Sequence, residues 1–146
     1  MSSKADSLRS IERELGVLLR RVRRKTAVNA RTIHPDLQPT AYSILLHVVE
    51  QGPGRAAQIV DDLGIDKGAV SRQVAHLENL GLVARSTDPA DGRAQRIEAT
   101  ALGHRRIAAL RQERRSDFAG RLSGWSADDL TELAERLARY NASLEP

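Results

Sequence analysis

The chain has 146 residues, of which 40% are hydrophobic and 29% charged, a composition typical of one soluble globular domain with or without a dimerisation extension. Cysteine is absent, which excludes disulfides and thiolate metal ligands from this chain. No apolar run approaches the roughly 20 residues that span a bilayer, and the N-terminal stretch lacks the apolar core of a secretory signal, so we expect a cytoplasmic protein without membrane contact.

The formal net charge is +4, and it is distributed unevenly along the chain. Residues 1–36 hold nine Lys/Arg and four Asp/Glu, a balance of +5, whereas residues 55–100 hold six and seven, a balance of −1. A basic balance favours polyanionic partners. Because the excess lies in the N-terminal segment, any contact of residues 55–100 with a polyanion depends on a few individual cations.

The first predicted helix covers about residues 5–32 and ends before the helix-breaking His34-Pro35-Asp36. Its aliphatic side chains recur in steps of three and four residues, the spacing of a seam that packs on another helix. The seam consists of Leu8, Ile11, Leu15, Leu18 and Val22. It is short, which favours packing against a partner helix over a long coiled coil.

Three shorter helices follow the first one. A proline in the favoured first position opens a helix over residues 39–51. A second helix over about residues 56–63 ends at Gly64, a residue suited to a left-handed C-cap. Asp66 can cap the third helix, which runs to about Leu80.

Two strands, over residues 82–87 and 94–99, come next and are joined by a turn-rich tip over residues 88–93. Gly92 allows a positive φ at that tip. These segments together predict a β-hairpin.

Two further helices are predicted after the hairpin. Thr100 can cap a long helix that reaches about Leu122, and Ser126, with Asp129 three residues on, can cap the last one. The last helix repeats the spacing of three and four residues at Leu130, Leu133, Leu137, Tyr140 and Leu144.

The order of these elements predicts a mainly α-helical fold with a small β-hairpin. Helix, glycine-containing turn, helix and then a two-stranded hairpin is the order of a winged helix-turn-helix. We expect residues 37–100 to form this domain, and residues 1–36 and 101–146 to form a helical dimerisation region. The apolar faces of the terminal helices could instead be intramolecular core, but together they exceed what the central domain has to cover.

The helix after Gly64 has two distinct faces. At about 100° per residue, Val70, Val74 and Leu77 fall within about 40° of each other and would face the core. The opposite face carries small and hydrogen-bonding residues, namely Gly68, Ser71, Arg72, Ala75, His76 and Asn79.

That outer face suits the major groove of DNA. Arg72 can donate two bonds to guanine, while Ser71 and Lys67 can hold phosphate. The alternative is the solvated face of an ordinary amphipathic helix. The glycine turn before this helix and the hairpin after it favour the DNA-binding interpretation.

The hairpin would add a second contact. Arg93 would project from the tip toward an adjacent minor groove, and Asp91 could pair with Arg93 and hold its guanidinium in place. The alternative is an ordinary exposed hairpin whose surface ion pair contributes little.

Several segments together resemble the MarR family of bacterial regulators. They are Asp66-Lys67-Gly68-Ala69-Val70-Ser71-Arg72, Leu77-Glu78-Asn79-Leu80-Gly81-Leu82-Val83, Asp88-Pro89-Ala90-Asp91-Gly92-Arg93, Ala99-Thr100-Ala101-Leu102-Gly103, and upstream Leu37-Gln38-Pro39-Thr40-Ala41-Tyr42. The second and third of these are fairly specific as a pair and weak separately. The resemblance covers essentially the whole chain.

The resemblance implies a homodimer, joined through its terminal helices, that binds pseudo-palindromic operators in double-stranded DNA. Such regulators are usually repressors, and a small aromatic or lipophilic anion often releases them from DNA. The DNA-contacting roles fall on Lys67, Ser71, Arg72, Gln73, His76 and Arg93, with Asp91 as the wing stabiliser. Two positions depart from the family pattern, because Gly68 stands where a hydroxyl residue is common and Gly92 replaces a frequent second wing arginine.

The resemblance also implies a pocket for a small effector between the dimer helices and the DNA-binding domain. Arg20, Arg24, Tyr42 and His47 could line it. On residue chemistry alone, His47 is more typical of a satisfied core histidine.

The sequence holds no pattern for an enzyme, a metal site or a bound cofactor. The four histidines lack ligand spacing, and neither a Ser/His/Asp set nor a phosphate-binding glycine loop occurs. The alternative to a DNA-binding regulator is a winged-helix protein-interaction module without specific DNA binding. The negative net charge of residues 55–100 and the presence of Gly68 favour this alternative.

Overall fold

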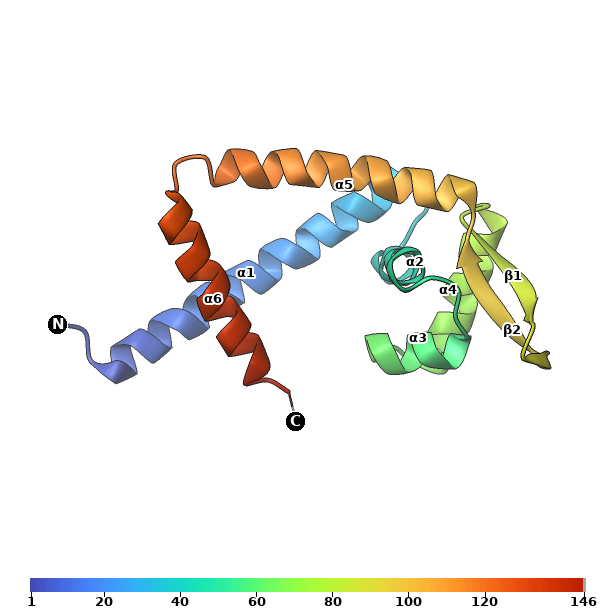
Figure 1. Cartoon of the computed structure of the whole chain (residues 1–146), viewed down its shortest axis with the longest axis horizontal. Helices are drawn as coiled ribbons and strands as arrows, with labels where there is room; N and C mark the ends of the chain where they lie inside the picture. The colour runs from blue at the N-terminus through green and yellow to red at the C-terminus, as the bar shows by residue number, and fades with distance from the viewer. Residues whose placement is uncertain (146) are drawn as a thin grey trace. The chain divides into compact units, whose positions relative to one another are not determined.

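The computed structural model describes residues 1–145, which form six α-helices and one antiparallel β-hairpin (Figure 1). The helices are α1 (Lys4–Ile33), α2 (Pro39–Gln51), α3 (Ala56–Leu63), α4 (Lys67–Asn79), α5 (Ala101–Arg121) and α6 (Ala127–Ala142), and the strands are β1 (Val83–Asp88) and β2 (Asp91–Ala99). The chain divides into two compact units, Met1–Leu110 and the segment that follows, so the division falls inside α5. The expected fold class, mainly helical with one small hairpin, is confirmed.

Local hydrogen bonds set the helix ends. Asp66 accepts the backbone N–H of Ala69 at 3.1 Å and caps α4, and Gly64 ends α3 in the left-handed region with a φ of 62°. At α6, the Ser126 hydroxyl accepts the N–H of Asp129 at 3.1 Å, and the Asp129 carboxylate accepts the N–H of Ser126 in return. These predicted caps are confirmed, because each needs only residues within one helical turn.

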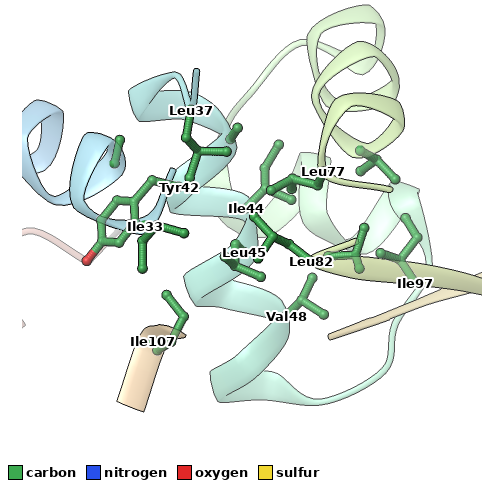
Figure 2. Close-up of a cluster of buried hydrophobic side chains, with 14 of the residues drawn as sticks. Ile33, Leu37, Tyr42, Ile44, Leu45, Val48, Leu77, Leu82, Ile97 and Ile107 are labelled. Carbon is green, nitrogen blue, oxygen red and sulfur yellow. The ribbon is translucent and has the colours of Figure 1, made fainter. Parts of the chain in front are cut away.

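The core of the first unit forms around α2, whose inward face carries Ile44, Leu45 and Val48, each at most 2% exposed (Figure 2). Side chains from α1, α4, the hairpin and the start of α5 converge on this face (Figure 2). They include Ile33, Leu37, Tyr42, Leu77, Leu82, Ile97 and Ile107. Full burial of each aliphatic side chain stabilises the fold by about 1.5–3 kcal/mol. This cluster therefore holds α1 to α4, the hairpin and the start of α5 together within the first unit.

The hairpin has a shorter turn than the sequence predicted. Its second strand begins at Asp91 and not at Ala94, and Asp91 lies opposite Asp88. The positive φ that Gly92 allows is not adopted, since among residues 1–145 only three other glycines have one. The physical reason is that the Asp88 carboxylate accepts the N–H of Ala90 at 2.8 Å, which closes the turn with a side chain and needs no left-handed glycine.

The first turn of α5 packs closely against the start of the hairpin. The Thr100 hydroxyl accepts the N–H of Gly103 at 3.1 Å and donates to the carbonyl of Gly81 at 2.6 Å, which confirms the predicted cap. A Cβ on Gly103 would lie 2.3 Å from the carbonyl oxygen of Leu82. Only glycine therefore permits this approach of helix to backbone.

The seams predicted on the first and last helices are exposed stripes in the single chain. On α1, Leu8, Ile11, Leu18 and Val22 are each 51–53% exposed. On α6 no residue is buried, and Leu130, Leu133, Leu137 and Tyr140 are 37–44% exposed. Within residues 1–145 no helix has both the length and the apolar character to cross a membrane.

Candidate nucleic-acid interface

The second helix of the helix-turn-helix, α4, is anchored by one face and open on the other. Val70, Val74 and Leu77 are at most 1% exposed, as their helical spacing predicted. Ser71 and Arg72 lie on the exposed face. The structure therefore presents a guanidinium and a hydroxyl to solvent on a helix that its neighbours hold in place.

Three other residues predicted on this helix have different surroundings. Lys67, at the first position of α4, is exposed, whereas Gln73 and His76 are half-buried. The Nε2 atom of His76 lies 3.2 Å from the carbonyl oxygen of Asp36, in the loop between α1 and α2. His76 thus holds α4 to that loop, a contact across 40 positions that the sequence did not predict.

The absence of a side chain at Gly68 leaves room for Arg72. A Cβ on Gly68 would lie 3.1 Å from Nη1 of Arg72 and 3.1 Å from Oδ2 of Asp66. The guanidinium of Arg72 therefore folds back over the first turn of α4, toward the carboxylate that caps it. This departure from the family pattern removes a possible contact at position 68 and also changes the space open to Arg72.

At the hairpin tip, Arg93 is exposed and its backbone is held by a carboxylate. Oδ1 of Asp91 accepts the backbone N–H of Arg93 at 3.1 Å. Asp91 therefore bonds the main chain of Arg93, and within residues 1–145 no ion pair joins these two side chains. The aspartate shapes the turn that carries Arg93.

A second carboxylate of the hairpin binds a residue that the sequence did not single out. Nε of Arg55, the residue before α3, donates to Oδ2 of Asp88 at 2.9 Å, and 12% of the Asp88 side chain is exposed. The pKa of Asp88 is lowered below its ordinary value, first by the N–H of Ala90 and then by Arg55. The only signal in the sequence was the composition of the turn, because 33 positions separate this pair.

The four candidate effector residues differ in their surroundings within residues 1–145. Tyr42 is buried in the core, while Arg20 and Arg24 are exposed on α1. Nε2 of His47 lies 2.9 Å from Oδ2 of Asp62, which joins α2 to α3.

Only one ring nitrogen of His47 has a hydrogen-bond partner, contrary to our expectation of a core histidine with both nitrogens hydrogen-bonded. Its Nδ1 atom is buried and has no hydrogen-bond partner. The ring also borders a hollow of about 580 Å³ between α2 and α3. The other lining residues are Ser43, Leu46, Glu50, Gln51, Asp62 and Leu63.

In the part of the chain that the structure describes, residues 1–145, no three His, Asp or Glu side chains come together in a way that could hold a metal ion. On the outer face of α4 the fold presents Lys67, Ser71 and Arg72, which are donors suited to phosphate and base edges.

Comparison with known proteins shows which class of protein this chain resembles. A family model described as MarR family matches residues 36–94. Over 131 residues the chain is 32% identical to the uncharacterized HTH-type transcriptional regulator YxaD of Bacillus subtilis strain 168, covering 90% of this chain and 90% of that protein.

Solved structures show the same architecture. The MarR family transcription regulator SP03579 is 25% identical, with a TM-score of 0.78 and coverage of 97% of this chain and 94% of that one. A protein of the same family from Listeria monocytogenes, complexed with 26mer DNA, is 20% identical with a TM-score of 0.71, covering 90% and 87%. These relatives are transcriptional regulators and not enzymes, as the sequence led us to expect. The chain belongs to the MarR family of winged helix-turn-helix transcriptional regulators.

Proposed function

We propose that this regulator acts as a homodimer that binds a pseudo-palindromic operator in double-stranded DNA and represses transcription there. The observation that carries the proposal is the polar outer face of α4, held rigidly from behind by Val70, Val74 and Leu77. A rigid helix with one free polar face is what insertion into a major groove requires. Operators lie on chromosomal DNA, so we propose that it works in the cytoplasm.

Within this proposal each side chain has a distinct task. Arg72 reads a guanine edge, and Lys67 and Ser71 bind phosphate, with support from their exposure on α4. Gln73 and His76 are half-buried, so their contacts with DNA are confined to the edge of the helix face.

The hairpin is proposed as the wing that reaches the neighbouring minor groove. Exposed Arg93 would enter that groove, whose narrow form attracts arginine. Asp91 supports the wing by accepting the N–H of Arg93, in place of the expected ion pair.

The exposed apolar stripes of α1 and α6 support the dimer. Monomeric proteins rarely leave contiguous apolar surface of this kind in water, and a second copy of the chain would cover it. A twofold-symmetric pair would offer two α4 helices to successive major grooves about 34 Å apart. That symmetry is the reason to expect a pseudo-palindromic site.

The repressor is further proposed to release DNA when a small aromatic or anionic ligand binds. Arg20, Arg24, Tyr42 and His47 are the candidate contacts. Guanidinium groups pair with carboxylates, and the buried Nδ1 of His47 has no hydrogen-bond partner among residues 1–145. A thermal-shift screen with aromatic acids tests this part separately from DNA binding.

Selection of bound fragments from a genomic library at physiological salt is the experiment that tests the function. We expect a twofold-symmetric motif, with binding that weakens steeply as salt concentration rises. Failure to select any motif would contradict the proposal and favour a winged-helix module that binds protein.

A further inference from the structure

The base of the hairpin is joined to the chain just before α3 by backbone hydrogen bonds. The N–H of Ile97 donates to the carbonyl of Gly54 at 2.8 Å, and the N–H of Gly54 donates to the carbonyl of Ile97 at 3.1 Å. This bridge brings the next residue, Arg55, beside the hairpin. The start of α3 and the wing are therefore neighbours through the main chain before any side chain contributes.

Arg55 then makes a second connection nearer the tip. Its Nε donates to Oδ2 of Asp88 at 2.9 Å, while Oδ1 of Asp88 accepts the N–H of Ala90 at 2.8 Å. Both carboxylate oxygens are in use, one toward α3 and one toward the turn. Since Asp88 is the last residue of β1, its position affects the turn that leads to Arg93.

We infer that Arg55 is a positioning residue for the wing, because through Asp88 it holds the hairpin tip that carries Arg93 at a set place relative to α3. α3 packs on α4, so this connection also sets the wing relative to the helix that reads the major groove. The inference rests on the proposed function, since a wing arginine needs positioning only if the wing meets DNA.

The environment of the carboxylate gives the contact more weight than an ordinary surface ion pair. Exposed pairs contribute little because water screens them. Here 47% of the Arg55 side chain is exposed but only 12% of the Asp88 side chain, and the bond is charge-assisted. A separate hollow beside this pair is lined by Arg55 and Asp88, and also by Asp61, Asp62 and Arg96. Asp88 therefore lies among charges of both signs.

A held wing binds more tightly for an entropic reason. A tip that moves freely in the unbound protein must be immobilised when Arg93 enters a groove, and that cost weakens binding. Because Arg55 and Asp88 already hold the tip in the free protein, less conformational entropy is lost when the wing binds. If Arg55 instead contacted a DNA phosphate directly, it would act through its charge, and its effect on affinity would not depend on Asp88.

The test measures hydrogen exchange of the Ala90 and Arg93 amides by NMR in the free full-length protein, and affinity for the selected operator. The variants are Arg55→Met, Asp88→Asn and the double variant. An amide group has one acceptor oxygen where the carboxylate has two, so Asp88→Asn must lose one of its two bonds. Arg96→Met is the matched control, because it removes one cation from the same hollow and no hydrogen bond to Asp88.

We expect faster exchange of the Ala90 amide in Arg55→Met and Asp88→Asn, and unchanged exchange in Arg96→Met. Each of the two variants should bind the operator about tenfold more weakly than the control. The double variant should bind no more weakly than either single one, because both remove the same connection.

Other outcomes overturn the inference in different ways. Additive losses of affinity would show that Arg55 contacts DNA directly and does not act through Asp88. Unchanged Ala90 exchange in free Arg55→Met would show that no such hold on the turn exists. Failure of the wild-type chain to bind any duplex would overturn the proposed function itself, and the exchange data on the free protein would tell that failure apart from loss of the connection.

Discussion

Single residues set both a close approach of helix to backbone in this fold and its proposed reading of DNA. Gly103 shows the first: the carbonyl of Leu82 occupies the space where any side chain would begin. Arg72 and Arg93 illustrate the second, since both are exposed, one on α4 and the other on the wing. Substitution at these positions separates stability from recognition.

Gly103→Ala should lower the free energy of unfolding by about 2 kcal/mol, because its Cβ would have to push the Leu82 backbone aside. Thermal or denaturant unfolding measures the loss. Gly120→Ala, in the same helix with no atom within 4 Å of its Cβ, is the control and should cost nothing. Equal losses in the two variants would show that helix α5 does not pack this closely.

Arg72→Ala should relax preference at a single base pair, by about 1–3 kcal/mol of discrimination, because a guanidinium reads one guanine. Arg93→Ala should weaken binding to all operators by a few kcal/mol at most. Fluorescence titration against the selected operator and its single-base variants measures both. Lys4→Ala, which removes one charge near the N-terminus, controls for net charge; unchanged affinity in both arginine variants would contradict the proposed docking.

At the scale of elements, local signals explain where most helices begin and end. Thr100, Ser126 and Asp66 act within one turn of their own positions, so the sequence alone predicted these ends. The wing was predicted less well. Its two strands were expected, but the tight turn depends on Asp88 and Arg55, and the latter comes from a distant part of the chain.

The cap of α6 predicts a measurable dependence on pH. Hydrogen bonds from the hydroxyl and the backbone N–H of Ser126 lower the pKa of Asp129 below its ordinary value. A carboxyl group whose pKa is lower in the folded state stabilises that state fully at pH values above its pKa in the unfolded chain. This stabilisation is lost as the pH falls through the pKa of the folded state. Asp129→Asn should therefore be less stable than wild type at pH 7, and the difference should vanish in acid.

Urea unfolding followed by circular dichroism at a series of pH values checks this prediction. The comparison with wild type isolates Asp129 from the other carboxylates, such as Asp6 and Asp88, whose pKa values are also lowered. A difference that stays constant from pH 7 to acid would rule out a contribution from the ionised carboxylate.

At the scale of the whole molecule, both terminal helices carry exposed apolar side chains. The exposed stripe of α6 suggests that the single chain is incomplete as a folded unit. Leu137→Asp should convert the proposed dimer to monomer, because a carboxylate would have to be buried without a partner at the interface.

Sedimentation or small-angle scattering measures the mass of this variant against wild type. Ala138→Asp, one position along and facing well away from the stripe, is the matched control and should remain dimeric. A monomeric wild-type protein would remove the twofold symmetry on which the operator prediction depends.

The sequence by itself determined the order of elements, the buried face of α4 and the helix caps, because these depend on periodicity and on residues within a turn of each other. Tertiary structure alone decided which carboxylate holds the wing, where His76 bonds, and that Gly103 faces a backbone carbonyl. Arg55 and Asp88 are 33 positions apart, and His76 and Asp36 are 40 apart. Such pairs leave no local pattern in a sequence, because their partners meet only after the apolar core has packed and brought distant segments together.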